Sequence, residues 1–363
     1  MKNILLSGSA DEVGKEIKKS LDRMLDTTKK WSEILQFDPD PQTGLSPKDI
    51  VWRKNKSKLY RYVSPHGYKH RTPILMVYAL INKAYMLDLT PGMSMVEHLI
   101  ESGFDVYLLD WGEFAWEDRN LSFGNLVKDY LARAVQEVCR ISASKELTIV
   151  GYCMGGTITS MYLSLFSQPT VKNVVMLAAP FDFSNAGVAS KWLQSPGYDA
   201  DKITNTLQLI PSNFIDVGVK MLRPLNNYWG TYTRLWKSID SDMPIDAWKA
   251  IDKWVNDNVN FPGEAYRQWI KDLYQQNKLI TNELIIQGQK VDLSRIQSNL
   301  LVMAGDKDHL VLPHQTSALL DCVSSTDKTF YSYPVGHGGL AFGNFAKTKV
   351  YPVISAWLAE RSD

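Results

Sequence analysis

From about residue 52 onward, short continuous apolar runs alternate with segments whose apolar positions recur every three to four residues. Continuous apolar runs are typical of strands buried on both faces of a sheet, and the longer period is typical of helices. We expect strands at 59–63 (an edge strand), 74–78, 105–110, 147–150, 171–178, 300–304 and 329–333. We expect helices at 93–102 and 124–141, one beginning at 155, one near 313–320, and a last one ending at about 361. This alternation predicts a mostly parallel sheet covered by helices on both faces.

Two segments depart from the alternation. Residues 10–35 repeat apolar residues at steps of four among lysines and acids, which predicts an amphipathic helix that the Pro/Asp-rich stretch 38–41 ends. Residues 183–292 show no strand–helix alternation and hold six of the eleven tryptophans. A crossover between parallel strands needs far fewer residues, so we interpret this segment as an inserted helical cap. The expected organisation is an N-terminal arm at 1–50, a core at 51–182 and 293–363, and the cap at 183–292.

Composition narrows the classes of function. The hydrophobic fraction of 45% fits a globular protein, and the net charge of +1 gives no reason to expect a nucleic-acid partner. Residues 1–72 carry 15 Lys and Arg against 9 Asp and Glu, which fits a solvated helix face or a surface for an acidic partner. Three cysteines without C-x-x-C spacing give neither a disulfide framework nor a zinc site, and they fit a reducing cytoplasm. The strongest apolar run, 73–81, is too short to span a bilayer.

The sharpest chemical signal is the sequence Gly-Tyr-Cys-Met-Gly-Gly at 151–156, between an expected strand and an expected helix. This is the context of the nucleophile-elbow motif G-x-S-x-G, with Cys153 in place of serine. The glycines allow a turn in which neighbouring side chains would collide. A thiolate is a strong nucleophile, and the thioester that it forms is a good acyl donor. The alternative is a structural cysteine beside helix-packing glycines, as we expect for Cys139 and Cys322.

An elbow nucleophile needs a base and an acid, which follow it in the order acid, then histidine. His337 lies between glycines on the loop after the last expected strand and is the best base. Asp308 and Asp306 both follow the strand at 300–304, and Asp308 fits the position of the acid better, although Asp306 stays open. His309 adjoins the acid and either supports it or has a purely structural role.

Together these residues predict a catalytic triad in an α/β-hydrolase fold. His337 takes the proton from Cys153, and Asp308 orients and stabilises the imidazolium. The backbone N–H of Met154 is the first expected oxyanion donor. The second should come from the loop after the strand at 74–78, for which we choose Ile81.

Further motifs carry a family resemblance along most of the chain. They are Tyr-Ala-Leu-Ile-Asn-Lys at 78–83, Tyr-Leu-Leu-Asp-Trp-Gly at 107–112, Asp-His-Leu-Val at 308–311 and Gly-His-Gly-Gly at 336–339. With the cysteine elbow, they make the chain resemble the polyhydroxyalkanoate synthases, in particular the short catalytic subunits of the two-component classes III and IV. The resemblance implies that Cys153, Asp308 and His337 polymerise short (R)-3-hydroxyacyl-CoA thioesters, such as 3-hydroxybutyryl-CoA, into a polyester. Coenzyme A is then a leaving group, and no metal or other cofactor is implied.

The resemblance also implies partners and a location. Only about 70 residues precede the hydrolase sheet, as in the forms that need a second, smaller subunit of the PhaR or PhaE type. The motifs lean toward class IV, found in Bacillus-type bacteria. Such an enzyme works at the surface of polyester granules in the cytoplasm; a homodimer is left open. The alternative functions are a cysteine-dependent thioesterase or other hydrolase, which transfers the acyl group to water, and a non-catalytic scaffold.

Overall fold

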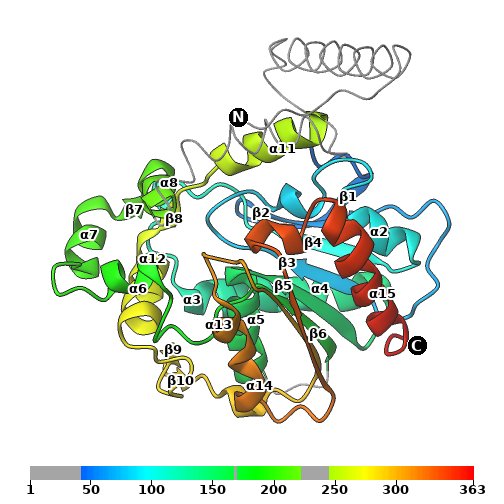
Figure 1. The fold of residues 1–363 in the computed structure, drawn as a ribbon. Helices are drawn as coiled ribbons and strands as arrows, with labels where there is room; N and C mark the ends of the chain where they lie inside the picture. Colours follow the sequence, from blue (N-terminus) through cyan, green and yellow to red (C-terminus); the bar gives the residue numbers. More distant parts are fainter. Residues whose placement is uncertain (1–41, 167–169, 222–244) are drawn as a thin grey trace, which may run out of the picture.

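The computed structural model describes residues 42–166, 170–221 and 245–363 (Figure 1). The helix expected at 10–35, and with it most of the arm expected at 1–50, lies outside the described residues. None of the helices within these ranges is long and apolar enough to cross a membrane.

An eight-stranded sheet forms the centre of the molecule, in the order β1-β2-β4-β3-β5-β6-β11-β12. The strands are β1 (Lys48–Lys54), β2 (Ser57–Tyr62), β3 (Ile74–Val77), β4 (Val106–Asp110), β5 (Leu147–Tyr152), β6 (Val171–Leu177), β11 (Asn299–Gly305) and β12 (Lys328–Tyr333). β2 pairs antiparallel with β1 and β4, and all other neighbours are parallel. The mostly parallel sheet predicted from the sequence is therefore confirmed.

One strand expectation is wrong. The segment at 59–63 was expected at the edge of the sheet, but β2 lies between β1 and β4, and β1 is the edge strand. Most residues of β1 are only partly buried or exposed, and its sequence Lys-Asp-Ile-Val-Trp-Arg-Lys shows no sustained alternation. The apolar pattern therefore gave no signal for it. β1 also begins at Lys48, within the last residues of the segment assigned to the arm.

Helices cover both faces of the sheet. In the core they are α2 (Met95–Glu101), α3 (Phe123–Asn125), a π-helical segment (Leu126–Leu131), α4 (Ala132–Ser142), α5 (Met154–Leu165), α13 (Pro313–Ser317), α14 (Leu319–Cys322), a second π-helical segment (Ala346–Val350) and α15 (Tyr351–Ala359). α2 and α15 pack against each other, whereas α5 packs against β5 and the first π-helical segment (Figure 1). The Ser94 hydroxyl begins α2 by accepting the N–H of Glu97 at 3.0 Å, which satisfies one of the free donors of the first turn.

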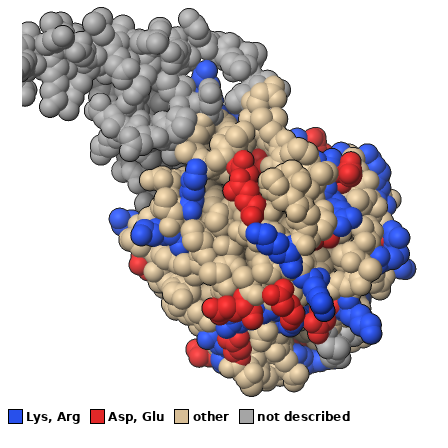
Figure 2. Space-filling model, turned by 90° about the vertical axis from the view of Figure 1, so that its right-hand side faces the viewer, with Lys and Arg blue, Asp and Glu red and all other residues tan. Residues whose placement is uncertain are grey.

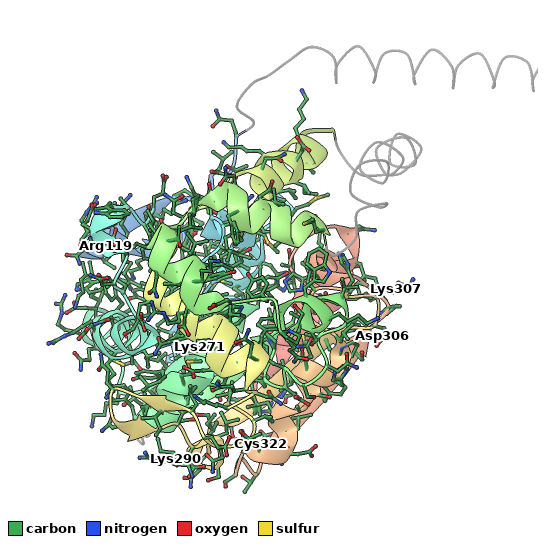
Figure 3. The ribbon with its side chains drawn as sticks, turned by 90° about the vertical axis from the view of Figure 1, so that its left-hand side faces the viewer. Arg119, Lys271, Lys290, Asp306, Lys307 and Cys322 are labelled. Atoms are coloured by element: carbon green, nitrogen blue, oxygen red, sulfur yellow. The ribbon has the colours of Figure 1, made fainter. Side chains whose placement is uncertain are left out.

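The segment between β6 and β11 is mostly helical where the structure describes it. Its elements are α6 (Val188–Leu193), α7 (Ala200–Leu207), β7 (Leu209–Ile210), α8 (Ser212–Met221), α11 (Ile245–Asn256), β8 (Phe261–Pro262), α12 (Gly263–Gln268), a π-helical segment (Trp269–Gln275), β9 (Ile285–Ile286) and β10 (Gln289–Lys290). Trp269 is buried and makes ring contacts with Phe123, Phe183 and Tyr274, so this tryptophan packs the interior. Lys271, which faces the viewer in Figure 3, pairs with Asp201 of α7 at 2.5 Å. Trp229 and Trp236 lie outside the described residues.

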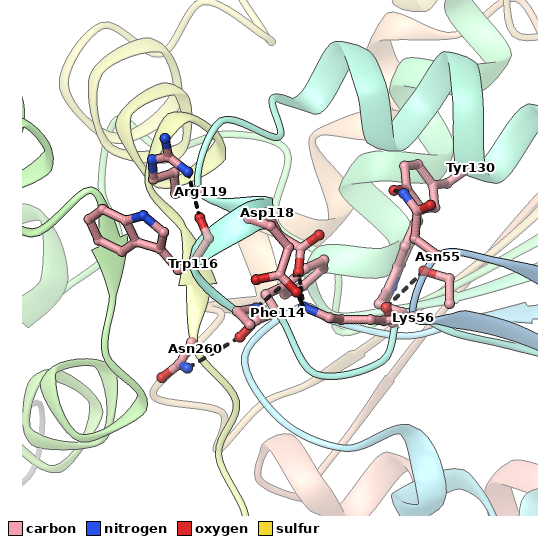
Figure 4. Close-up of polar contacts among 12 residues, drawn as sticks. Asn55, Lys56, Phe114, Trp116, Asp118, Arg119, Tyr130 and Asn260 are labelled. Atoms are coloured by element: carbon pink, nitrogen blue, oxygen red, sulfur yellow. Dashed lines mark hydrogen bonds and ion pairs between the residues drawn. The ribbon is translucent and has the colours of Figure 1, made fainter.

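Polar contacts join this segment to the loop after β4 (Figure 4). Asn260 of that segment donates to the carbonyl of Phe114 at 3.2 Å. The turn between β1 and β2 reaches the same loop, since Lys56 pairs with Asp118 at 2.6 Å. On another face, Lys and Arg side chains lie among Asp and Glu side chains (Figure 2). This mixture agrees with the small net charge and gives that face no broad field of one sign.

The start of α5 lies unusually close to the sheet. A Cβ added at Gly155 would collide with the carbonyl oxygen of Val77 in β3, and a Cβ added at Gly156 would collide with the Cβ of Ala179. The first of these neighbours is backbone and cannot rotate away. Glycine is therefore required where the helix passes over the strand ends.

We predict that Gly155→Ala lowers the free energy of unfolding by about 1–3 kcal/mol, because the added methyl group must push α5 away from β3. Gly197→Ala is the matched control, since a Cβ there would meet nothing within 4 Å. It should change stability by less than about 0.5 kcal/mol. Urea unfolding of both variants tests this, and equal stability of the two would contradict the packing argument.

Candidate active site

Cys153 lies at a sharp turn between β5 and α5. Its backbone has φ 53° and ψ −129°, a conformation that a residue with a side chain rarely adopts. Two backbone hydrogen bonds hold the turn: the N–H of Cys153 donates to Leu177 of β6, and the N–H of Gly156 donates to Cys153, both at 2.9 Å. Such strain costs roughly 1–3 kcal/mol and persists only where the surrounding structure imposes it. This strained turn places Cys153 just beyond the end of β5 and before the start of α5, as the elbow motif predicts.

Asp308 is buried in the turn that follows β11, with 3% of its surface exposed. One carboxylate oxygen accepts the N–H groups of Leu310 and Val311, at 2.9 and 3.0 Å. The other lies 2.7 Å from Nδ1 of His337. Burial alone would raise the pKa of Asp308, but the His337 charge and these hydrogen bonds outweigh it and lower the pKa.

Asp306, the alternative acid, is placed differently. Its side chain is exposed, and it accepts a hydrogen bond from the Ser332 hydroxyl. The structure thus brings Asp308, and not Asp306, to His337. His309 is partly buried in the same turn as Asp308; its supporting role stays a prediction.

His337 begins a short 3-10 turn, His337–Leu340, in the loop after β12. Its side chain is only 10% exposed, and this burial opposes protonation. The charges of Asp308 and Cys153, together with hydrogen bonds to both side chains, outweigh burial and raise the pKa of His337 well above its ordinary value. Cys153, Asp308 and His337 therefore meet in one place, although the first and the last are 184 positions apart in the sequence.

This electrostatic coupling also links the site to stability. Because the folded pKa of Asp308 is lowered, its contribution is present above the ordinary carboxyl pKa of about 4 and is lost as the pH falls through the folded value. Because the folded pKa of His337 is raised, its contribution is complete below about pH 6.5 and is lost as the pH rises through the folded value. Both contributions are present together between about pH 4 and 6.5.

Three tyrosines lie near the thiol, two of them buried. Tyr78 and Tyr152 are nearly fully buried, and their rings stack at a centroid distance of 5.6 Å. Burial first, and the charge of nearby Cys153 second, raise the pKa of Tyr78 and of Tyr274. The partly buried thiol of Cys153 thus lies near aromatic side chains, away from much of the solvent, where charges interact more strongly than in water.

The two expected oxyanion donors come from different elements. Met154 is the first residue of α5, where backbone N–H groups have no partner within the helix. Ile81 lies in the loop after β3, and its carbonyl accepts the N–H of Val259 at 3.1 Å. That loop contacts the cap segment further, since Trp254 Nε1 donates to the carbonyl of Lys83 at 3.1 Å. The oxyanion roles of Met154 and Ile81 stay predictions.

One contact in the site was not predicted from the sequence. The Tyr152 hydroxyl donates to the backbone carbonyl of His337 at 2.9 Å. A tyrosine inside an elbow motif is not by itself a signal, because its partner lies far away in the sequence. Within the described residues, no group of three or more His, Cys, Asp or Glu side chains could hold a metal ion.

Two family models match the chain. Residues 72–337 match the alpha/beta hydrolase fold, and residues 12–99 match the N-terminus of poly-beta-hydroxybutyrate polymerase (PhaC). Among solved structures, a putative lipase from Sulfolobus solfataricus has a TM-score of 0.60 at 14% identity, covering 89% of this chain and 97% of the other. A monoacylglycerol lipase from Paleococcus ferrophilus has a TM-score of 0.53 at 16% identity, covering 84% and 99%. At these identities the likeness concerns the fold alone.

Relatives similar in sequence are named poly(3-hydroxyalkanoate) polymerase subunit PhaC. The protein from Haloferax mediterranei is 35% identical over 94% of this chain and 69% of its own length. The protein from Synechocystis is 34% identical over 95% of this chain and 94% of its own. The protein from Thiocystis violacea is 33% identical over 93% and 96%.

We predict that Asp308→Asn lowers the pKa of His337 relative to the unmodified protein, because it removes the facing negative charge while burial still opposes protonation. Asp306→Asn, the neighbouring exposed carboxylate, should leave the His337 titration unchanged. Imidazole nitrogen NMR of protein labelled at histidine measures both. An unchanged titration in Asp308→Asn would show that the carboxylate does not control His337.

Proposed function

Because the chain belongs to the PhaC family of poly(3-hydroxyalkanoate) polymerases, we propose that it builds polyester from short-chain (R)-3-hydroxyacyl-CoA through a thioester on Cys153. The protein is an acyltransferase of the alpha/beta hydrolase fold. The observation that supports the covalent route is the strained elbow that presents Cys153 to a buried His337–Asp308 pair.

The first half-reaction transfers the acyl group to the enzyme. Cys153 gives its proton to His337, and its sulfur attacks the thioester carbonyl of the substrate. The carbonyl electrons move onto oxygen, which accepts the backbone N–H of Met154 and that of Ile81. The bond to the coenzyme A sulfur then breaks, and His337 returns the proton to that sulfur. Asp308 stabilises the imidazolium throughout.

The second half-reaction lengthens the chain. The 3-hydroxyl of a further unit loses its proton to His337, and its oxygen attacks the thioester on Cys153. An ester bond forms, the C–S bond breaks, and the thiolate of Cys153 is regenerated and takes the proton back. The lengthened chain is now the coenzyme A thioester of the added unit, and it acylates Cys153 again as in the first half-reaction. Asp308 assists by keeping His337 oriented toward the hydroxyl. All atoms come from substrate and protein, so the reaction requires no further cofactor.

The aromatic surroundings favour this acceptor over water. Tyr78, Tyr152 and Tyr274 lie close enough to Cys153 for its charge to raise their pKa values, and a site with little water lets a bound hydroxyl compete for the thioester. In an open site, hydrolysis would release the free hydroxy acid. The related polymerases also argue against a hydrolase, since they share about a third of their residues with this chain over more than nine tenths of it.

We further propose that the enzyme works with a small helical subunit of the PhaR type, or alternatively of the PhaE type, at the surface of cytoplasmic polyester granules. The alignment with the Synechocystis and Thiocystis proteins over 94% and 96% of their lengths supports the short, two-component kind of catalytic subunit. The Cupriavidus necator polymerase, by contrast, aligns over only 48% of its length.

We predict that the purified protein releases coenzyme A from (R)-3-hydroxybutyryl-CoA and forms polymer, and that adding the small subunit raises the rate. Cys153→Ala should lower the rate by at least about a thousandfold, because no other group can form the thioester. Free coenzyme A, polymer and monomeric acid are measured together.

Cys139→Ala is the matched control, because this partly buried thiol of α4 lies away from the elbow. It should retain the full rate. Release of coenzyme A with only free acid would indicate a hydrolase. Coenzyme A release that persists in Cys153→Ala would rule out the proposed nucleophile. If the unmodified protein releases no coenzyme A with or without the subunit, the non-catalytic scaffold becomes the better interpretation.

A further inference from the structure

We propose that two buried tyrosine hydroxyls, those of Tyr152 and Tyr351, hold the turn that carries His337 and thereby set the position of its imidazole relative to Cys153. Both act through His337 and are positioning residues. The inference rests on the proposed role of His337 as the base for Cys153. Neither tyrosine takes part in the two half-reactions themselves.

Tyr152 ties the turn to the nucleophile elbow. It directly precedes Cys153, its residue is only 1% exposed, and its hydroxyl donates to the carbonyl of His337 at 2.9 Å. Its ring also meets the imidazole edge-on, with a centroid distance of 5.3 Å and an interplanar angle of 63°. One side chain therefore bridges the residue beside the nucleophile and the backbone of the base. A shift of the His337 backbone away from the elbow must stretch this bond.

Tyr351 holds the other end of the same turn. It is the first residue of α15, it is also 1% exposed, and its hydroxyl donates to the carbonyl of Ala341 at 2.6 Å. Ala341 directly follows the turn His337–Leu340. The turn is thus fixed at its first residue by the elbow and just beyond its last residue by the final helix.

The turn needs support from outside because its own sequence is permissive. Gly336, Gly338 and Gly339 surround His337, and glycine has more backbone freedom than any other residue. Within the turn, Gly339 donates to Gly336 at 3.0 Å and Ala341 donates to Gly338 at 2.9 Å. These few bonds by themselves leave the turn free to shift. Such a shift matters, because a misplacement of a catalytic group by about 1 Å can cost about a hundredfold in rate.

The two hydroxyls are suited to act as donors at every working pH. Burial raises the pKa of Tyr152 and of Tyr351, so both stay protonated. Each therefore keeps its hydrogen while the charge on His337 and Cys153 changes during the reaction. A buried tyrosine hydroxyl also requires a partner, which fixes its direction.

The test compares Tyr152→Phe and Tyr351→Phe with Tyr107→Phe. Each change removes one buried hydroxyl and keeps the ring. Tyr107 is fully buried, and its hydroxyl donates to Asp105 at 3.0 Å, at the start of β4 and so at the opposite end of the sheet from the elbow. It therefore controls for the loss of a buried hydrogen bond as such.

Two readouts are needed. The first is kcat and KM for coenzyme A release. The second is the rate at which iodoacetamide alkylates Cys153 across a range of pH, followed on the Cys153 peptide by mass spectrometry. Tyr152→Phe should lower kcat about tenfold with little change in KM, and slow alkylation at neutral pH severalfold, because the imidazolium no longer stays beside the thiolate. Tyr351→Phe should have a smaller effect of the same kind, and Tyr107→Phe none.

Wild-type kcat and a wild-type alkylation profile in both Tyr152→Phe and Tyr351→Phe would overturn the proposal. So would an equal change in Tyr107→Phe, which would indicate general destabilisation. If Tyr152→Phe does not fold, Tyr351→Phe still decides, because it leaves the elbow intact. His337→Gln tests the role of His337 separately from the role of the tyrosines. An unchanged alkylation rate in this variant would contradict the proposed function itself, independently of the tyrosines.

Discussion

The buried contact between Asp308 and His337 is the interaction on which the rest of the site depends. Burying a charged carboxylate away from water costs free energy unless hydrogen bonds replace the water. The Asp308 carboxylate has such partners in the imidazole of His337 and in two backbone N–H groups. These bonds keep Asp308 charged, and its charge in turn keeps the pKa of His337 high in a place where burial opposes protonation. The histidine can then hold a proton beside the thiol of Cys153, which proton transfer between them requires.

The geometry of this contact is imposed by the sheet. β5 delivers Cys153 at a strained turn, and the adjoining strand β6 holds that turn through the carbonyl of Leu177. β11 and β12 end beside each other, so the turns that carry Asp308 and His337 begin at the same edge. Side-chain hydrogen bonds then position the turns that follow these strands, as the bond from the Tyr152 hydroxyl to the His337 carbonyl does. The cap segment joins the same assembly through Trp254, which bonds to the loop after β3 and meets Phe342 near the His337 turn.

Sequence patterns predicted the parts of the fold that local chemistry determines. Continuous apolar runs marked β3, β5 and β6 because these strands are buried on both faces, and the elbow motif placed Cys153 between a strand and a helix. The two-residue strands β7 and β8 were missed, since they are too short for any periodicity and exist only through their mutual pairing. The contact of Tyr152 with His337 was missed because the two residues lie 185 positions apart. Long-range contacts of this kind depend on the finished fold, which no local pattern encodes.

The proposed mechanism requires an acyl thioester on Cys153. The most direct measurement is mass spectrometry of the Cys153 peptide after the protein is mixed with (R)-3-hydroxybutyryl-CoA and quenched with acid within the first turnovers. We expect 3-hydroxyacyl groups bound to Cys153, one unit at first and longer chains later, and none on Cys139 or Cys322. Polymer formation with the Cys153 peptide never modified, or with the acyl group on another residue, would contradict it.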